Sequence, residues 1–234
     1  MWTRQDLKMR GKMAFQRNYW PCVAVALILA IVTGVGSTSS FRSGRDYGDY
    51  YFNNYSFSSF FTTSLVVTGT FIFLAAIILI VFVGNILQVG GNHFFVLNQT
   101  ENANVGIIGH GFKSGNYGNI VLVMFMRDLF TYLWTLLFII PGIVKSYEYK
   151  MIPYILAENP GMPRQEAFLI SKKMMMGQKW DVFVLDLSFI GWELLSLCTC
   201  GLLNVFYVEP YRQATLAELY TANRTMAYES GFIR

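Results

Sequence analysis

The chain has 234 residues, of which 54% are apolar and only 14% charged, whereas a soluble domain has about 25% charged residues. That composition, with no Asp, Glu, Lys or Arg between Asp49 and Glu101, excludes an ordinary soluble domain and indicates a protein of the lipid bilayer. The net charge of +4 comes from basic residues beside apolar runs rather than from a separate basic stripe, so we expect no nucleic-acid partner.

Residues 1–19 form a basic segment that is long enough to be an amphipathic helix of its own. A cleaved signal peptide has a shorter basic region, so we expect the following apolar run to stay attached. That run predicts a first membrane helix from about Trp20 to Gly36. Basic residues beside a membrane helix favour the cytoplasmic side, which predicts a cytoplasmic N-terminus. The basic side chains are those of Arg4, Lys8, Arg10, Lys12 and Arg17.

Residues 37–62 are rich in Ser, Gly, Tyr and Phe, which is typical of a polar and aromatic loop on the extracytoplasmic side. A second membrane helix is predicted from about Thr63 to Leu87, and the pair Gly90-Gly91 is expected to mark its end. The Gly- and Asn-rich stretch that follows predicts an interfacial loop with short helical pieces.

A third membrane helix is predicted over Ile120–Ile140, with a hairpin at Pro141-Gly142. We expect residues 143–157 to return through the membrane, because otherwise the basic residues after them would lie outside. Residues 163–180 have the apolar spacing of an amphipathic interfacial helix. The last apolar run, VFVLDLSFIGWELLSLC, is then expected to cross to the outside of the membrane. The chain from Gly201 onward returns as a partly polar helix.

These elements predict an all-α fold, a single integral membrane domain over residues 1–234. It is a polytopic transmembrane helical bundle of about six helices, some short or broken, with both termini cytoplasmic. Five or fewer full crossings remain an alternative, because residues 143–157 are short for a crossing and residues 201–222 are partly polar. The predicted location is the cell membrane.

Four long stretches resemble a bacterial integral membrane family known only as domain of unknown function 975. They are Gly84–Gln99, Gly115–Trp134, Leu136–Leu195 and Glu209–Tyr220. The resemblance implies a multi-helix bacterial membrane protein, and it implies no activity.

Four charged residues inside apolar runs form the candidate site, namely Arg127, Asp128, Asp186 and Glu193. An arginine at membrane depth costs about 2.5–3.5 kcal/mol on insertion scales, so it needs a partner. Because adjacent residues on a helix do not face each other, we expect Arg127 to pair with Asp186 and Asp128 to face elsewhere. Asp186, Glu193 and Ser196 share one helical stripe. Two interpretations stay open: a polar cavity for a substrate, proton or ion, or a clamp between helices.

Familiar catalytic signatures are missing from the sequence, including HExxH, GxSxG and GxxxxGK[ST]. His93 and His110 could meet and bind a metal, although ordinary loop histidines are more common. Cys198-Thr199-Cys200 is not a zinc spacing. We therefore expect no enzyme activity, catalytic residue, metal or cofactor.

The sequence favours a non-enzymatic membrane scaffold, sensor or accessory protein, whose partners are the lipid bilayer and either another membrane protein or a second copy. The alternative is a small transporter or export accessory that uses Arg127, Asp128 and Asp186. A transporter needs a water-filled path to these charges, whereas a scaffold needs them sealed in pairs.

Overall fold

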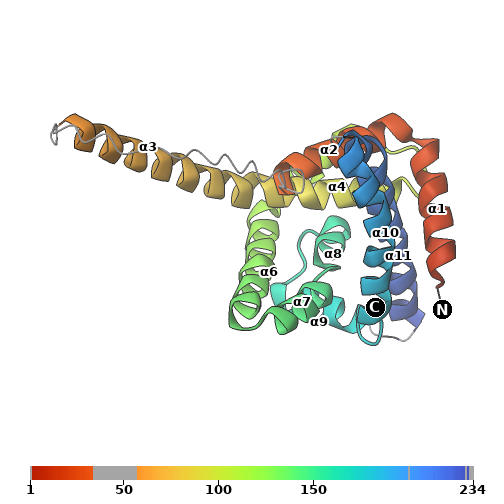
Figure 1. The fold of residues 1–234 in the computed structure, drawn as a ribbon. Helices are drawn as coiled ribbons and strands as arrows, with labels where there is room; N and C mark the ends of the chain where they lie inside the picture. The colour runs from red at the N-terminus through yellow and green to blue at the C-terminus, as the bar shows by residue number, and fades with distance from the viewer. Residues whose placement is uncertain (1, 34–56, 200, 230, 232–234) are drawn as a thin grey trace.

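The computed structural model describes residues 2–33, 57–199, 201–229 and 231, and in these ranges every regular element is a helix (Figure 1). The predicted all-α class is therefore confirmed. The elements are α1 (Arg4–Arg17), α2 (Tyr19–Thr33), α3 (Phe57–Leu79), the π-helical turn η1 (Ile80–Gly84), α4 (Asn85–Leu97), the 3₁₀ turn η2 (Val105–Gly109), α5 (His110–Lys113), α6 (Tyr117–Leu137), α7 (Ile139–Glu148), α8 (Ile152–Glu158), α9 (Arg164–Met174), α10 (Lys179–Cys198), the π-helical turn η3 (Asn204–Val208) and α11 (Glu209–Glu229).

Helix α4 is the centre of the molecule and packs against α2, α6, α8 and α11. The expectation that Gly90-Gly91 ends the helix is wrong, because α4 continues to Leu97. A side chain at Gly90 would collide with the backbone of Ile108, and one at Gly91 would lie within 2.9 Å of the Leu29 side chain. The two glycines therefore allow close approach rather than a turn.

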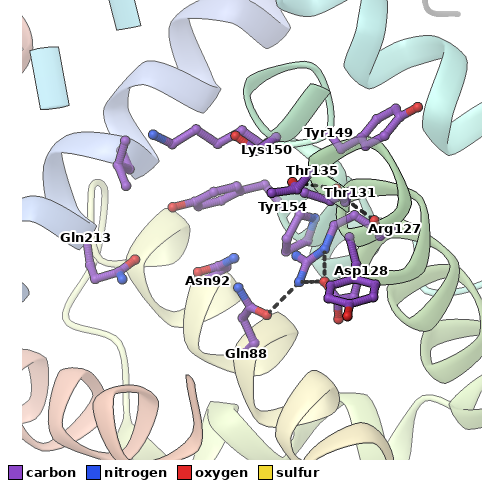
Figure 2. Close-up of a pocket in the computed structure, with 14 residues that line it drawn as sticks. Gln88, Asn92, Arg127, Asp128, Thr131, Thr135, Tyr149, Lys150, Tyr154 and Gln213 are labelled. Carbon is purple, nitrogen blue, oxygen red and sulfur yellow. Dashed lines mark hydrogen bonds and ion pairs between the residues drawn. The ribbon is translucent and has the colours of Figure 1, made fainter. Parts of the chain in front are cut away.

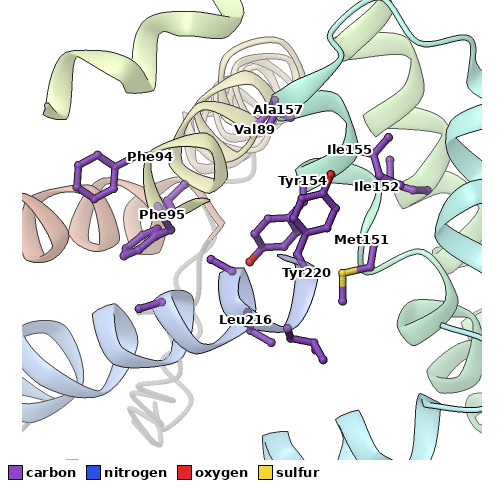
Figure 3. Close-up of a cluster of buried hydrophobic side chains, with 14 of the residues drawn as sticks. Val89, Phe94, Phe95, Met151, Ile152, Tyr154, Ile155, Ala157, Leu216 and Tyr220 are labelled. Atoms are coloured by element: carbon purple, nitrogen blue, oxygen red, sulfur yellow. The ribbon is translucent and has the colours of Figure 1, made fainter. Parts of the chain in front are cut away.

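A buried aromatic cluster joins α4, α8 and α11 (Figure 3). The rings of Tyr154 and Tyr220 stack with their centroids 5.2 Å apart, beside the fully buried Phe94 and Phe95. The Tyr220 hydroxyl donates to the Glu158 carboxylate at 2.7 Å, so its polar end is satisfied inside the core.

Helix α1, which forms most of the basic segment 1–19, packs along α11. Its buried residues recur every three or four positions, at Leu7, Gly11, Ala14 and Phe15. Thr215 lies so close to Gly11 that an added side chain would collide with it. Helix α11 also packs against α4, and most of its residues from Glu209 to Tyr220 are buried.

Exposed apolar side chains gather in three places at the edges of the body that α1, α2, α4, α8 and α11 form. Helix α3 projects as an arm, as Figure 1 shows, and Phe71 is 71% exposed. The turn between α6 and α7 exposes Leu136, Leu137, Phe138, Ile139 and Ile140. The end of α10 and the chain after it expose Leu194, Leu195, Leu197, Leu202 and Phe206.

The α6–α7 hairpin differs from the predicted one at Pro141-Gly142. Helix α6 ends at Leu137, Phe138 is extended, and Pro141-Gly142 lie in the first turn of α7. Proline is tolerated there because the first turn of a helix leaves backbone N–H groups unbonded. Gly142 lies against Thr135, where an added side chain would collide, so the two helices touch closely.

Residues 143–157 are not the single returning helix that the sequence suggested. The segment is divided between α7, of 10 residues, and α8, of 7 residues, with a turn between them. Residues Ile152–Ala157 of α8 are buried in the body. Of the predicted loop 37–62, residues 37–56 lie outside the described residues, as do 34–36 of the first predicted helix, and 57–62 begin α3.

Among the described residues, α6 is the one helix that is both long and apolar enough to cross a membrane. Shorter apolar helical stretches lie at Tyr19–Leu29, Ser64–Ala75 and Val81–Leu97.

The packing at α4 predicts opposite effects for two glycine substitutions. Gly90→Ala should lower the free energy of unfolding by about 1–3 kcal/mol, because the new methyl group meets the backbone of Ile108. Gly118→Ala, in α6, has nothing within 4 Å of the new carbon and should be neutral or raise stability by up to about 1 kcal/mol. Thermal unfolding of the two detergent-solubilised variants measures this, and equal effects would contradict the central role of α4.

Candidate functional site

A cavity of about 530 Å³ lies between α4, α6, the α7–α8 segment and α11 (Figure 2). Most of its lining residues carry a hydroxyl, amide or charged group, although carbon atoms form the larger part of the wall surface. The lining residues are Gln88, Asn92, Arg127, Asp128, Thr131, Tyr132, Thr135, Ser146, Tyr149, Lys150, Pro153, Tyr154, Gln213 and Leu216. The cavity contains two of the four residues that the sequence singled out.

Arg127 and Asp128 bond to each other in the wall of this cavity. The Arg127 Nε and Nη2 atoms donate to Asp128 Oδ1 at 2.8 and 2.6 Å, and Nη2 also donates to Gln88 Oε1 at 3.2 Å. The predicted pairing of Arg127 with Asp186 is therefore wrong. The rule that neighbours on a helix do not face each other fails here because the arginine side chain is long enough for its guanidinium to reach the adjacent carboxylate.

Asp186 belongs to a separate charge network that joins three segments. Its Oδ2 atom lies 2.5 Å from Lys150 Nζ, in the α7–α8 turn, and accepts a hydrogen bond from the Tyr147 hydroxyl at 3.0 Å. Arg212, in α11, lies 3.7 Å from Asp186 Oδ1 and 3.6 Å from Glu193 Oε1. Asp186 and Glu193 thus share a stripe as predicted, and the stripe faces α11.

The two groups of charges differ in exposure. The side chain of Asp128 is 49% exposed, whereas those of Asp186 and Lys150 are 16% and 19% exposed. Asp186 and Lys150 neutralise each other between helices, which is how a clamp works. Asp128 keeps an oxygen, Oδ2, that can accept a hydrogen bond from a molecule in the cavity.

Glu148 is a buried carboxylate that the sequence analysis missed. Its oxygens lie 3.0 Å from Lys145 Nζ, 2.9 Å from Lys179 Nζ and 3.9 Å from Lys172 Nζ. It thereby joins α7, α9 and the start of α10. The spacing of Lys145 and Glu148 is a signal in the sequence, but the other two lysines approach only through the tertiary fold.

The amphipathic segment 163–180 forms α9, the turn after it and the start of α10. Ala167, Ile170 and Met174 of α9 are buried against the body, and Lys172 is exposed, as the spacing predicts.

His93 and His110 meet, with stacked rings whose centroids are 4.7 Å apart. Burial and the neighbouring His110 lower the pKa of His93. The described residues contain no group of three His, Cys, Asp or Glu side chains that could hold a metal ion. The stacked rings form a contact between α4 and α5.

A family model covers most of the chain, from residue 50 to residue 226. The chain belongs to the family described as "Protein of unknown function (DUF975)". All the residues that line the cavity fall within the DUF975 match. No curated protein and no solved structure matches the chain.

The charge network of this DUF975 protein predicts which residue pairs are coupled. Lys150→Met alone should destabilise by about 3–5 kcal/mol, because it leaves Asp186 buried beside fewer positive charges, and adding Asp186→Leu should recover part of that loss. Arg127→Leu and Asp186→Leu should instead be additive within about 0.5 kcal/mol, because they share no partner. Double-mutant cycles from chemical unfolding measure both coupling energies. If Arg127 and Asp186 were coupled and Lys150 and Asp186 were not, the observed pairing would be contradicted.

Proposed function

We propose that this protein is a multi-pass protein of the cell membrane that binds a small polar solute in the cavity beside Arg127 and Asp128. It acts as a small transporter or an export accessory and not as an enzyme, with its N-terminus in the cytoplasm. The observation that carries the proposal is the half-exposed Asp128 carboxylate in the wall of an open, polar-lined cavity.

The exposed apolar helices support a membrane location. Helix α3 has 23 residues and no charged side chain, and its described side chains from Ser64 onward are exposed almost without exception. At about 1.5 Å per residue, α3 is about 35 Å long, enough for a hydrocarbon core of about 30 Å. A helix that is apolar all round needs lipid or protein to cover it.

The α6–α7 hairpin favours partial entry into the bilayer. Helix α7 has 10 residues and is about 15 Å long, half of the hydrocarbon core. A tip at Phe138 in the middle of the bilayer would leave Glu148 and its lysines at the headgroup level, where charge is tolerated. Full passage of α6 would instead leave these charges near the bilayer centre, at a cost of several kcal/mol. Arg127 lies ten positions before Leu137, so it shares the level of Glu148.

The cavity wall favours a solute with several hydrogen-bonding groups. Asn92, Gln88 and Gln213 offer both donors and acceptors, and Thr131 and Ser146 offer hydroxyls. Tyr149 and Tyr154 add aromatic faces. A volume of about 530 Å³ suits a small molecule rather than a peptide chain.

The scaffold or sensor function is the second candidate, and the paired state of the charges supports it. Lys150 and Arg212 balance the charges of Asp186 and Glu193, and Arg127 already bonds to Asp128. In that case the cavity would be a gap between packed helices, and a second copy or another membrane protein would cover α3.

Single-cysteine labelling tests whether water reaches the cavity. In a chain whose own cysteines are replaced, Thr131→Cys should react with a membrane-impermeant maleimide from one side of the membrane only. Leu136→Cys, at the apolar hairpin tip, is the matched control on the same helix and should stay unlabelled because lipid covers it.

Three outcomes separate the candidates. Labelling of Thr131→Cys but not Leu136→Cys supports the solute cavity. Protection of both cysteines from the maleimide would support the scaffold or sensor function instead. Recovery of the protein in the aqueous fraction after an alkaline carbonate wash would overturn the membrane location itself.

A further inference from the structure

Three lysines converge on one carboxylate at the junction of α7, α9 and α10. Lys145, Lys179 and Lys172 lie 3.0, 2.9 and 3.9 Å from the oxygens of Glu148, whose side chain is only 5% exposed. Three positive charges and one negative charge leave an excess of two positive charges. Among the described residues, Glu148 is the one acid within 4.0 Å of any of these three ammonium groups.

The nearest other acid in sequence does not remove the excess. Asp181 follows Lys179 by two positions, and it lines a neighbouring hollow with Arg4, Trp2 and Gln178. Arg4 brings a further positive charge to that hollow. The electrostatic field at the α9–α10 turn therefore attracts anions.

A pocket opens at this turn and exposes two of the three lysines. Its volume is about 310 Å³, and its wall is formed by Lys172, Met176, Gly177, Lys179 and Trp180. Gly177 has a φ of +79°, a left-handed conformation that glycine adopts without strain. The turn that it makes leaves Met176 64% exposed and Trp180 71% exposed beside the ammonium groups.

We propose that this pocket binds the phosphate of an anionic phospholipid, with Lys172 and Lys179 on the phosphate and Trp180 and Met176 at the edge of the acyl chains. The proposal rests on the membrane location proposed above but not on the solute cavity. Ammonium groups bind phosphate as point charges, and a tryptophan with one apolar and one polar end suits the headgroup region.

The position of the pocket favours a lipid over a free phosphate. Figure 1 shows the α6–α7 turn, α9 and the start of α10 along the same edge of the molecule. The α6–α7 turn and the α9–α10 turn therefore lie toward one side of the molecule. A free phosphate would need the ammonium groups alone. It would leave the Met176 side chain and the outer part of the Trp180 indole, which contacts Phe183, exposed to water.

The full chain in a non-ionic detergent provides the test. Its binding of dihexanoyl-phosphatidylglycerol, dihexanoyl-phosphatidylcholine and inorganic phosphate is measured by isothermal titration calorimetry. Lys172→Gln is the main variant, because Lys172 is 58% exposed and the most distant of the three from Glu148. Trp180→Ala probes the apolar side of the pocket. Lys12→Gln, at an exposed position of α1, removes the same charge elsewhere and is the control.

We expect phosphatidylglycerol to bind more tightly than the other two molecules. Lys172→Gln should weaken its binding about five-fold, the usual effect of one lysine at an anionic lipid surface. Trp180→Ala should weaken it as well, Lys12→Gln should not, and the melting temperatures of the variants should match that of the parent.

Every other result overturns the headgroup site. Equal weakening by Lys12→Gln would mean general surface charge, equal binding of inorganic phosphate would mean a soluble anion, and no binding would mean that the lysines serve Glu148 alone. If the protein stays in membranes during the carbonate wash and yet gives one of these results, only the headgroup site is overturned. If the wash releases the protein, the proposed membrane location is overturned as well.

Discussion

The close approach of α4 to its neighbours at Gly90 and Gly91 is the constraint on which the rest of the structure depends. Gly90 touches the backbone at Ile108, and Gly91 receives the side chain of Leu29, so α4 lies deep between η2 and α2. On another face of α4, Gln88 and Asn92 lie one turn apart and form a wall of the cavity. The same helix therefore closes the core and shapes the site, and an outward shift of α4 would change both.

Among the described residues, three of the four charge groups join different helices, and the pair Arg127–Asp128 does not. The ion pair of Arg224 with Glu158 joins α11 to α8. Glu148 joins α7, α9 and α10, and Asp186 joins the α7–α8 turn, α10 and α11. Breaking either would leave a buried charge without its partners, which makes them parts of the fold. Arg127 and Asp128 bond within one turn of α6, and their contact with the rest of the molecule is a hydrogen bond to Gln88. A solute can replace that bond without unpacking helices, so Arg127 and Asp128 suit recognition better than the other charges do.

Apolar periodicity and length predicted the helices, but the sequence could not show where neighbouring backbones touch. Gly90-Gly91 looked like the end of a helix because glycine both terminates helices and permits close packing, and only the neighbour at Ile108 distinguishes the two uses. The stripe of Asp186 and Glu193 follows from their spacing of seven. Their partner Arg212 was missed because nothing in its local sequence shows that α11 lies against α10. The bond between Arg127 and Asp128 does not follow from helical spacing, because it depends on the length of the arginine side chain.

The lengths of the hairpin helices connect the two proposals. Helix α7 rises about 15 Å from the apolar tip to Glu148, and Arg127 lies the same distance from the tip along α6. The polar cavity and the lysine pocket then share one level, while the apolar residues from Leu133 to Val144 lie beyond it. Charges cost least where headgroups and water meet hydrocarbon, and an apolar tip costs least in the hydrocarbon. One depth in the bilayer would therefore satisfy both proposals, with the cavity open to water and a lipid headgroup beside it at the α9–α10 turn.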